Sequence, residues 1–391
     1  MKTDMATLSD FDDIRPYADE EMRGAFYKLF ADRQFRQIIK GYVPWLPWFV
    51  IEGVFKLSLI GIKTTYGFQK RFMAPLVGYV VKKHGDGFKF ENHPDNTYDN
   101  RYTFVSNHRD IVLDSAILDY SLMRTGSKAS CEIAIGDNLL IYPWIRNFVR
   151  INKSFMVRRA LTPRDMLKSS IHMSEYIHYA VNVKRENIWL AQREGRAKDS
   201  NDRSQESVFK MLALGFKGAP SDALKDVNIV PLTISYEFDP CDYLKAKEFQ
   251  LKRDVPTYKK SRKDDLENMR VGIKGYKGKI VYRTAPCINS WLDELKDVKG
   301  QEFFQTVASR VDKSIHSNYE IYPNNYIALD TLNGNEDYST HYTEADKERF
   351  FTYLDGQLAK IDIENKDEEF LMERMLTMYA NPFRNYLKAT E

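Results

Sequence analysis

Short apolar runs alternate with helical patterns between residues 100 and 290. The runs are rich in β-branched and aromatic residues and are short enough for strands. The clearest helix follows Thr162-Pro163, because Thr is a good N-cap and Pro suits the first helical position. This alternation predicts an α/β domain. The predicted strands are Tyr102–Ser106, Cys131–Ile135, Phe155–Val157, Ile188–Ala191, Ile229–Ser235 and Lys279–Arg283.

Helical patterns flank this region on both sides. Residues 10–40 predict a charged helical lead-in, and the tail from about residue 340 predicts two charged helices. The stretch 245–279 is rich in Lys and Arg, and we expect a solvated insertion there, or else a surface that faces a membrane or a phosphate. The predicted division is an N-terminal helical region (1–95), an α/β domain (96–330) and a C-terminal helical tail (331–391).

Residues 41–83 have an apolar, aromatic body flanked by Lys and Arg. Such a segment suits the bilayer interface, although an aromatic helical pair packed on the core has the same composition. The longest uncharged apolar run, 41–51, is ended by Glu52 and is shorter than the ~20 residues that span a bilayer. The first residues, MKTDMATLSDFDD, have no signal-peptide pattern. We therefore expect peripheral attachment to the cytoplasmic side of a membrane.

Composition narrows the classes of partner. The chain has 391 residues, 43% of them hydrophobic, and a net charge of +3. This charge is too balanced to indicate nucleic acid, and we expect no nucleic-acid partner. Cys131, Cys241 and Cys287 are far apart and match no zinc or redox spacing, so we expect no metal and a reducing compartment.

The first candidate for catalysis is His108, in the segment FVSNHRDIVLD. It follows a predicted strand and precedes a predicted helix, so the sheet edge would expose it. Its ordinary pKa of ~6.5 makes histidine a usable base near neutrality. A neighbouring carboxylate would fix its tautomer, and both Asp110 and Asp114 could supply one. Asp110 could instead cap the following helix.

Three further segments are of interest: two have charged residues at the end of a predicted strand, and one is a predicted strand that contains a proline. SFMVRRALTPRD ends its strand in Arg158 and Arg159, which could clamp a phosphate bidentately or form ordinary surface charge. The loop IWLAQREGRAKDS could bind a phosphate or be a charged turn. NIVPLTISYE predicts a strand with Pro231 at an edge or bend. The candidate residues of the loop are Arg193, Glu194, Gly195, Arg196 and Lys198.

Together, in this order, the four segments resemble the four motifs of the glycerolipid acyltransferase superfamily. Its first motif has Asn-His and then Asp after four residues. FMVRR is similar to the FIRR second motif of the glycerol-3-phosphate acyltransferases, REGRAK to their EGGRSR third motif, and IVPLTISYE to their VPI fourth motif. Residues 309–330 resemble the segment that follows the core in the bacterial glycerol-3-phosphate branch. The resemblance spans roughly residues 100–330.

The chain departs from the family pattern at two places. Five residues separate His108 from Asp114, where the family has four. An ungapped match of the third motif aligns Gly195-Arg196 with the family's Gly-Arg and leaves Glu194 one position off. Asp114 can partner His108 only if the turn between them absorbs one extra residue.

The resemblance implies a fold and a reaction. The fold would be an α/β sheet flanked by helices, with N-terminal helices that dock on a membrane and C-terminal helices. His108, aided by Asp114, would act as general base, and the cations of the second and third motifs would hold a phosphate. The donor would be acyl-CoA or acyl-carrier protein, and the acceptor glycerol 3-phosphate or a lysophospholipid. Such a reaction needs no metal and no cofactor.

Two other classes of function compete with this hypothesis. A catalytically silent relative could bind lipid or act as a membrane scaffold, which the irregular His–Asp spacing would favour. A serine hydrolase is disfavoured, because no Gly-x-Ser-x-Gly elbow is present to hold a nucleophile.

Overall fold

The computed structural model describes residues 7–159 and 161–391. Residues 1–6 of the predicted N-terminal region and Ala160 of the second motif lie outside the described residues. Within the described part, seven strands form one sheet in the order β1-β7-β6-β2-β5-β3-β4. The strands are β1 (Gly87–Glu91), β2 (Thr103–Ser106), β3 (Cys131–Gly136), β4 (Ser154–Val157), β5 (Asn187–Ala191), β6 (Ile229–Tyr236) and β7 (Lys279–Thr284).

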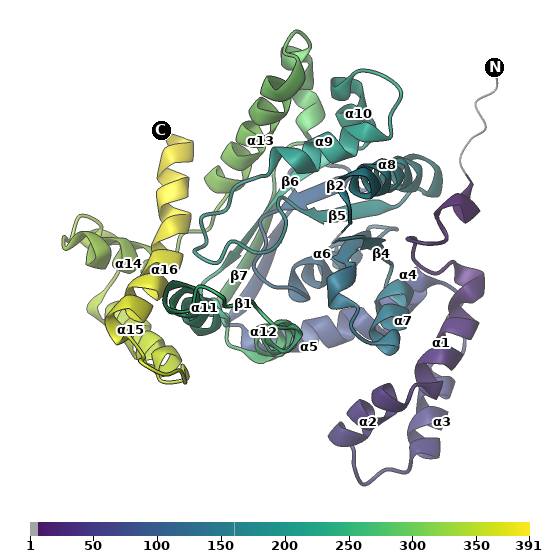
Figure 1. Ribbon diagram of the computed structural model, residues 1–391, viewed down its shortest axis with the longest axis horizontal. Coiled ribbons are helices and arrows are strands. Elements are labelled where there is room, and N and C mark those ends of the chain that lie inside the picture. Colours follow the sequence, from purple (N-terminus) through teal and green to yellow (C-terminus); the bar gives the residue numbers. More distant parts are fainter. Residues whose placement is uncertain (1–6, 160) are drawn as a thin grey trace.

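The sheet is mostly parallel, and helices cover both of its faces (Figure 1). Neighbouring strands run parallel except β6 and β7, which are antiparallel. The α/β class is confirmed, and each of the six predicted strands is present. The edge strand β1 was missed, since three of its five residues, GFKFE, are charged or glycine and none is fully buried.

Pro231 lies in an interior strand, so the expectation of an edge position is wrong. β6 pairs with β2 on one side and β7 on the other. The carbonyl of Pro231 accepts a hydrogen bond from the N–H of Ala285, 2.9 Å away and just beyond β7. The backbone N and O of a strand residue point to the same neighbouring strand, so the nitrogen of Pro231 also faces β7. The missing N–H therefore lies just beyond the end of the β6–β7 pairing, and no hydrogen bond to β2 is lost.

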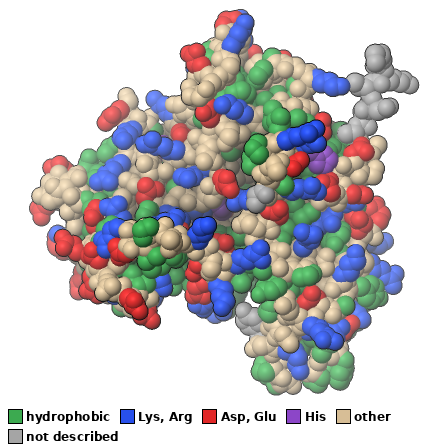
Figure 2. Space-filling view, in the orientation of Figure 1, with side chains coloured by type: hydrophobic (Ala, Val, Ile, Leu, Met, Phe, Trp, Pro, Cys, Tyr) green, Lys and Arg blue, Asp and Glu red, His purple; other side chains and the backbone are tan. Residues whose placement is uncertain are grey.

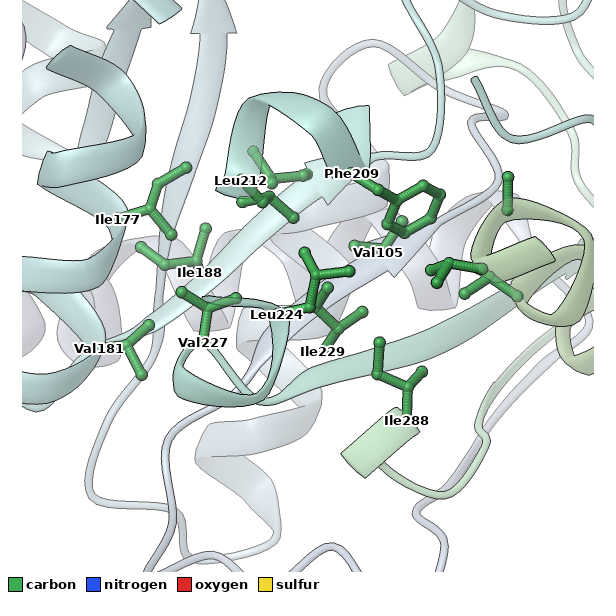
Figure 3. Close-up of a cluster of buried hydrophobic side chains, with 14 of the residues drawn as sticks. Val105, Ile177, Val181, Ile188, Phe209, Leu212, Leu224, Val227, Ile229 and Ile288 are labelled. Carbon is green, nitrogen blue, oxygen red and sulfur yellow. The ribbon is translucent and has the colours of Figure 1, made fainter. Parts of the chain in front are cut away.

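Two hydrophobic cores sandwich the sheet. One face packs on α8, α9, α10 and α13, and Figure 3 shows Val105, Ile188 and Ile229 of adjacent strands meeting Phe209 and Leu224 there. The other face packs on α5 (Ala74–His84) and α6. The helices between β1 and the C-terminal region are α6 (Leu113–Arg124), α7 (Pro143–Ile151), α8 (Pro163–Tyr179), α9 (Glu206–Leu214), α10 (Pro220–Asp226), α11 (Asp242–Asp254), α12 (Arg262–Lys274) and α13 (Gly300–Ser317).

The N-terminal helices extend away from the sheet at the lower right of Figure 1. Their own aromatic core packs on α7. Trp45 and Phe49 nevertheless remain 75% and 76% exposed, and Figure 2 shows hydrophobic side chains gathered at this end of the molecule. Among the described residues, no helix has the length and apolar content to cross a bilayer. The helices that extend away from the sheet are α1 (Met22–Ala31), α2 (Arg33–Tyr42) and α3 (Trp48–Ser58). Helix α4 (Thr65–Phe68) follows them and leads to α5, which packs on the sheet.

The C-terminal helices share a core with α11, so they pack on the α/β region. They are α14 (Pro323–Asn333), α15 (Glu344–Leu358) and α16 (Glu368–Thr390). The boundary predicted after residue 95 falls between β1 and β2, and that predicted after residue 330 falls inside α14. The division into three parts stays a prediction.

A buried carboxyl group joins the N-terminal helices to the sheet and makes stability depend on pH. Asp119 of α6 accepts hydrogen bonds from Gln69 (3.1 Å) and from the N–H of Cys131 (2.7 Å). Burial raises the pKa of Asp119 to about 7, whereas the bond from Cys131 opposes the rise. The folded chain therefore keeps a proton that the unfolded chain loses near the model-compound pKa of 3.8.

We expect the folded state to lose stability through Asp119 as the pH rises from about 4 to about 7. Asp119→Asn removes this dependence. The melting temperature of the natural chain, relative to that of Asp119→Asn, should therefore fall between pH 4.5 and pH 7.5, roughly the ends of that window. Asp222→Asn, which changes an exposed carboxylate of α10, is the control and should give no such trend. If the melting temperatures of the natural chain and Asp119→Asn differ by the same amount at both pH values, Asp119 is not the group that makes stability depend on pH.

Candidate active site

The segments that carry the four motifs meet at one edge of the sheet. β2, β3, β4, β5 and β6 run parallel, so their carboxyl ends lie together. In the register, Ser106 lies opposite both Ala191 and Leu232. The loops that follow β2 and β5 are therefore neighbours at the edge where ligands bind in open α/β sheets.

His108 forms a dyad with Asp114 in the loop after β2. Its Nδ1 lies 2.7 Å from Oδ2 of Asp114, which belongs to the first turn of α6. The His108 side chain is 13% exposed, whereas that of Asp114 is fully buried. No described residue forms a hydrogen bond with Nε2 of His108. The dyad therefore presents an imidazole nitrogen that can accept a proton, backed by a carboxylate.

The turn between these residues absorbs the extra position. Asp114 also accepts hydrogen bonds from the backbone N–H groups of Arg109 (2.7 Å) and Asp110 (3.0 Å), which wrap the loop around its carboxylate. Asp110 has the alternative, helix-capping role: its Oδ1 accepts from the N–H groups of Val112 and Leu113, both at 2.8 Å. Burial and the nearby Asp114 raise the pKa of Asp110. Of the two carboxylates, Asp114 is the one that reaches His108.

Asn107 and Trp189 fix the position of the loop. The Asn107 amide bonds both backbone groups of Ile234 in β6, donating at 2.9 Å and accepting at 2.8 Å. The ring of Trp189 in β5 meets the imidazole of His108 edge-on, with centroids 5.7 Å apart. Asn107 therefore has a structural role within the first motif, since it holds the loop to the neighbouring strand.

The loop after β5 brings two arginines with unpaired N–H groups to this edge. Arg196 donates from one Nη to Oδ1 of Asn268 at 2.8 Å, and its Nη1 is buried without a hydrogen-bond partner among the described residues. Nε of Arg193 is likewise buried and unpartnered there. Buried donors are normally satisfied by protein, ordered water or a ligand, so these two groups remain as donors of the loop for an added acceptor atom.

Of the other candidate residues of this loop, Lys198 and Glu194 form ion pairs, and Gly195 shapes the backbone. Lys198 forms an ion pair with Glu248 of α11, and burial lowers the pKa of Lys198 to about 8. Gly195 has a φ of +69°, the left-handed region that glycine enters without strain. Glu194 lies 3.2 Å from Nη1 of Arg159, an ion pair that joins the loop to the end of β4.

The two arginines after β4 diverge. Arg159 turns toward the loop after β5 through its pair with Glu194. Arg158, which was predicted to help clamp a phosphate, pairs instead with Asp13 at 2.6 Å, and that carboxylate also lies 2.9 Å from Nε2 of His172. Alternate residues of a strand point to opposite sides, so adjacent arginines at its end separate in the same way.

The Lys- and Arg-rich stretch 245–279 contributes to this edge of the sheet. Gly272 of α12 packs against Asp110 so closely that a Cβ would collide with the carboxylate. The same helix supplies Asn268 to Arg196, and α11 supplies Glu248 to Lys198. Parts of α11 and α12 therefore pack at the candidate site, whereas residues 252–257 and 261–263, where α11 ends and α12 begins, are exposed, as expected for a solvated insertion. Composition could not show the contacts with the site, because the contacting residues are scattered among exposed lysines.

A buried ion pair is formed by Arg109, the residue that follows His108 of the dyad. Arg109, 7% exposed, lies 2.7 Å from Oδ2 of Asp202, and the Tyr319 hydroxyl donates to the same oxygen at 2.8 Å. The Arg109 guanidinium lies over the Tyr319 ring, 5.8 Å from its centroid. None of these three residues was a sequence candidate, since a lone Arg or Asp in a polar loop carries no periodic signal.

The comparisons with known proteins identify no family for this chain. No family model matches it, and no curated protein matches it at the threshold used. Among solved structures, a 1-acyl-sn-glycerophosphate (LPA) acyltransferase, PlsC, from Thermotoga maritima is similar with a TM-score of 0.39 and 13% identity. That match covers 68% of this chain and 87% of the other.

We expect Arg109→Met to destabilise the fold strongly, because it leaves the Asp202 carboxylate buried without its cation. The expected cost is about 3–5 kcal/mol in the free energy of unfolding, measured by urea denaturation. The double variant Arg109→Met/Asp202→Asn should recover part of that loss.

Arg310→Met is the matched control, since it breaks a pair with Glu294 of similar length (2.6 Å) at the surface. Exposed pairs contribute about 0–1 kcal/mol, so this variant should change stability little. Equal losses for the two single variants would show that burial of the Arg109 pair is unimportant.

Proposed function

We propose that this protein transfers an acyl group from a thioester to a hydroxyl group of a phosphate-bearing acceptor. The observation that carries the proposal is the 2.7 Å contact between His108 and the buried Asp114, which leaves the other imidazole nitrogen unpartnered among the described residues. The unpartnered N–H groups of Arg193 and Arg196 in the adjacent loop support it, as does the order of the four motifs.

The proposed reaction needs one base and no covalent enzyme intermediate. Nε2 of His108 takes the proton of the acceptor hydroxyl as its oxygen attacks the thioester carbonyl. The carbon–sulfur bond then breaks, and the imidazolium returns its proton to the leaving thiolate. Asp114 holds Nδ1 and stabilises the imidazolium between these two steps.

The acceptor phosphate would bind at the loop after β5. Guanidinium groups bind phosphate oxygens with two parallel hydrogen bonds, and Arg196 has a donor to spare. Arg193 would add positive charge around it, and Lys198 and Arg159 would do so only if each is shared between the phosphate and the carboxylate with which it pairs. Glycerol 3-phosphate is favoured by FMVRR and by residues 309–330, and a lysophospholipid is the other acceptor that we would test. The donor would be acyl-CoA or acyl-carrier protein.

We further propose that the enzyme works at the cytoplasmic surface of a membrane, as a peripheral protein. Exposed apolar side chains of the N-terminal region support this, among them Trp45 between α2 and α3, and Phe49 and Leu57 of α3, the last of which is 67% exposed. Aromatic and aliphatic side chains gain stability when they leave water for the interfacial region of a bilayer.

We expect His108→Ala to lower acyl transfer by at least ~10²-fold, the usual scale for loss of a general base. The assay would offer labelled acyl-CoA or acyl-carrier protein with glycerol 3-phosphate or a lysophospholipid. His178→Ala is a matched control. His178 lies on α8, and its Nδ1 is likewise hydrogen-bonded to a carboxylate, 2.5 Å from Oδ2 of Asp226. Activity per folded protein should be nearly unchanged in this control.

Two outcomes would count against the proposal. Near-normal transfer by His108→Ala would remove His108 as the base. Lipid binding by the natural chain, with no transfer to any acceptor, would instead favour a catalytically silent, membrane-scaffolding protein.

We expect Arg196→Met to weaken binding of the acceptor more than that of the donor. Its guanidinium is the group with a buried, unpartnered N–H, so the KM for the phosphate-bearing acceptor should rise roughly tenfold or more. The KM for the thioester should change less. Arg310→Met is again the control, since it removes the same guanidinium group from a surface ion pair with Glu294. A larger change in the KM for the donor would place Arg196 at the other substrate.

A further inference from the structure

We propose that the groove between α1 and α3 binds one acyl chain of an anionic phospholipid, with the headgroup phosphate near Arg23 and Lys63. The groove involves none of the residues of the sheet edge. The proposal therefore goes beyond acyl transfer and can succeed or fail independently of it.

The groove is an apolar cavity of about 530 Å³. This volume lies within the roughly 300–1,000 Å³ that is usual for sites of small ligands. Met22, Phe26 and Phe30 of α1 are buried residues at helical spacing and form one side. Leu59, Ile60 and Ile62, at and after the end of α3, form the other. A surface of this kind, lined by hydrocarbon on both sides, suits an alkyl chain.

The rim of the groove carries positive charge that the protein leaves unpaired. Arg23 and Lys63 are exposed, and neither forms an ion pair with a described residue. Lys56, which also lines the groove, is neutralised by Glu52 at 2.7 Å. The one lining carboxylate, Asp19, accepts a hydrogen bond from the N–H of Thr65 at 2.9 Å. Two free cations beside an apolar groove complement an anionic headgroup joined to a chain.

The groove continues into a larger exposed apolar surface, which favours a bilayer lipid over a soluble ligand. Ile60 lines the groove and is 66% exposed. Leu57 and Phe49 precede it by one and three helical turns and are also exposed. If this surface rests on a bilayer, a lipid beside it can place a chain in the groove without leaving the membrane.

The test uses a phosphatidylglycerol whose chain bears a diazirine, diluted in phosphatidylcholine vesicles with the full-length protein. After irradiation and digestion, we expect label on peptides that contain residues 22–30 and 56–63. A phosphatidylcholine probe with the same chain should label these peptides at least about tenfold less, since it lacks net negative charge. His108→Ala should be labelled like the natural chain, so loss of catalysis does not affect the readout.

Charge reversal at the rim isolates the site from general attraction to the membrane. Arg23→Glu/Lys63→Glu should lower groove labelling by at least about tenfold per vesicle-bound protein. Lys28→Glu/Lys40→Glu changes net charge equally at exposed positions of α1 and α2, outside the groove, and should keep groove labelling within about twofold. Equal loss in both double variants, equal labelling by both lipids, or label confined to other peptides would overturn the proposal.

Discussion

The buried carboxylate of Asp114 is the constraint on which the candidate site depends. A fully buried carboxylate is costly unless donors surround it, and this one has three, namely the Nδ1 of His108 and two backbone N–H groups. Those bonds decide the path of the chain between β2 and α6, and with it the direction of the imidazole. A catalytic group placed in this way is held by the same interactions that fold the loop, so its orientation needs no substrate to set it.

The same principle extends from the dyad to the C-terminal helices. The segment from the end of β6 to the start of α11 carries acidic residues that the tail satisfies. Tyr379 of α16 donates to Asp242 at 2.7 Å, and Arg349 of α15 lies 3.0 Å from Glu237. Tyr319 links the Asp202 pair to the segment before α14. Burying polar groups in this way demands complete networks, since a half-satisfied one destabilises the fold. The tail therefore serves as part of the scaffold behind the site.

The elements of the fold were largely predictable, and the contacts that build the site were only partly so. Hydrophobic periodicity located six strands because buried strands have short apolar runs, and it missed β1 because no residue of this edge strand is fully buried. His108 could be identified from its place at a strand end. Its partner could not be assigned, since the choice between Asp110 and Asp114 depends on the dihedral angles of the turn. The roles of Asn268, Glu248 and Asp202 depend on contacts between distant segments, which spacing does not encode.

Pairing separates the cations that stabilise the fold from those that remain for a ligand. Arg158 and Lys198 were, like Arg196, among the predicted phosphate ligands, yet their partners are Asp13 and Glu248. A cation already paired with a carboxylate must lose that pair, or share it, before it binds phosphate. Arg193 and Arg196 keep buried N–H groups with no acceptor among the described residues, so they can bind an added acceptor without breaking a bond that these groups already make. This argument concentrates the acceptor site on the loop after β5, beside the imidazole.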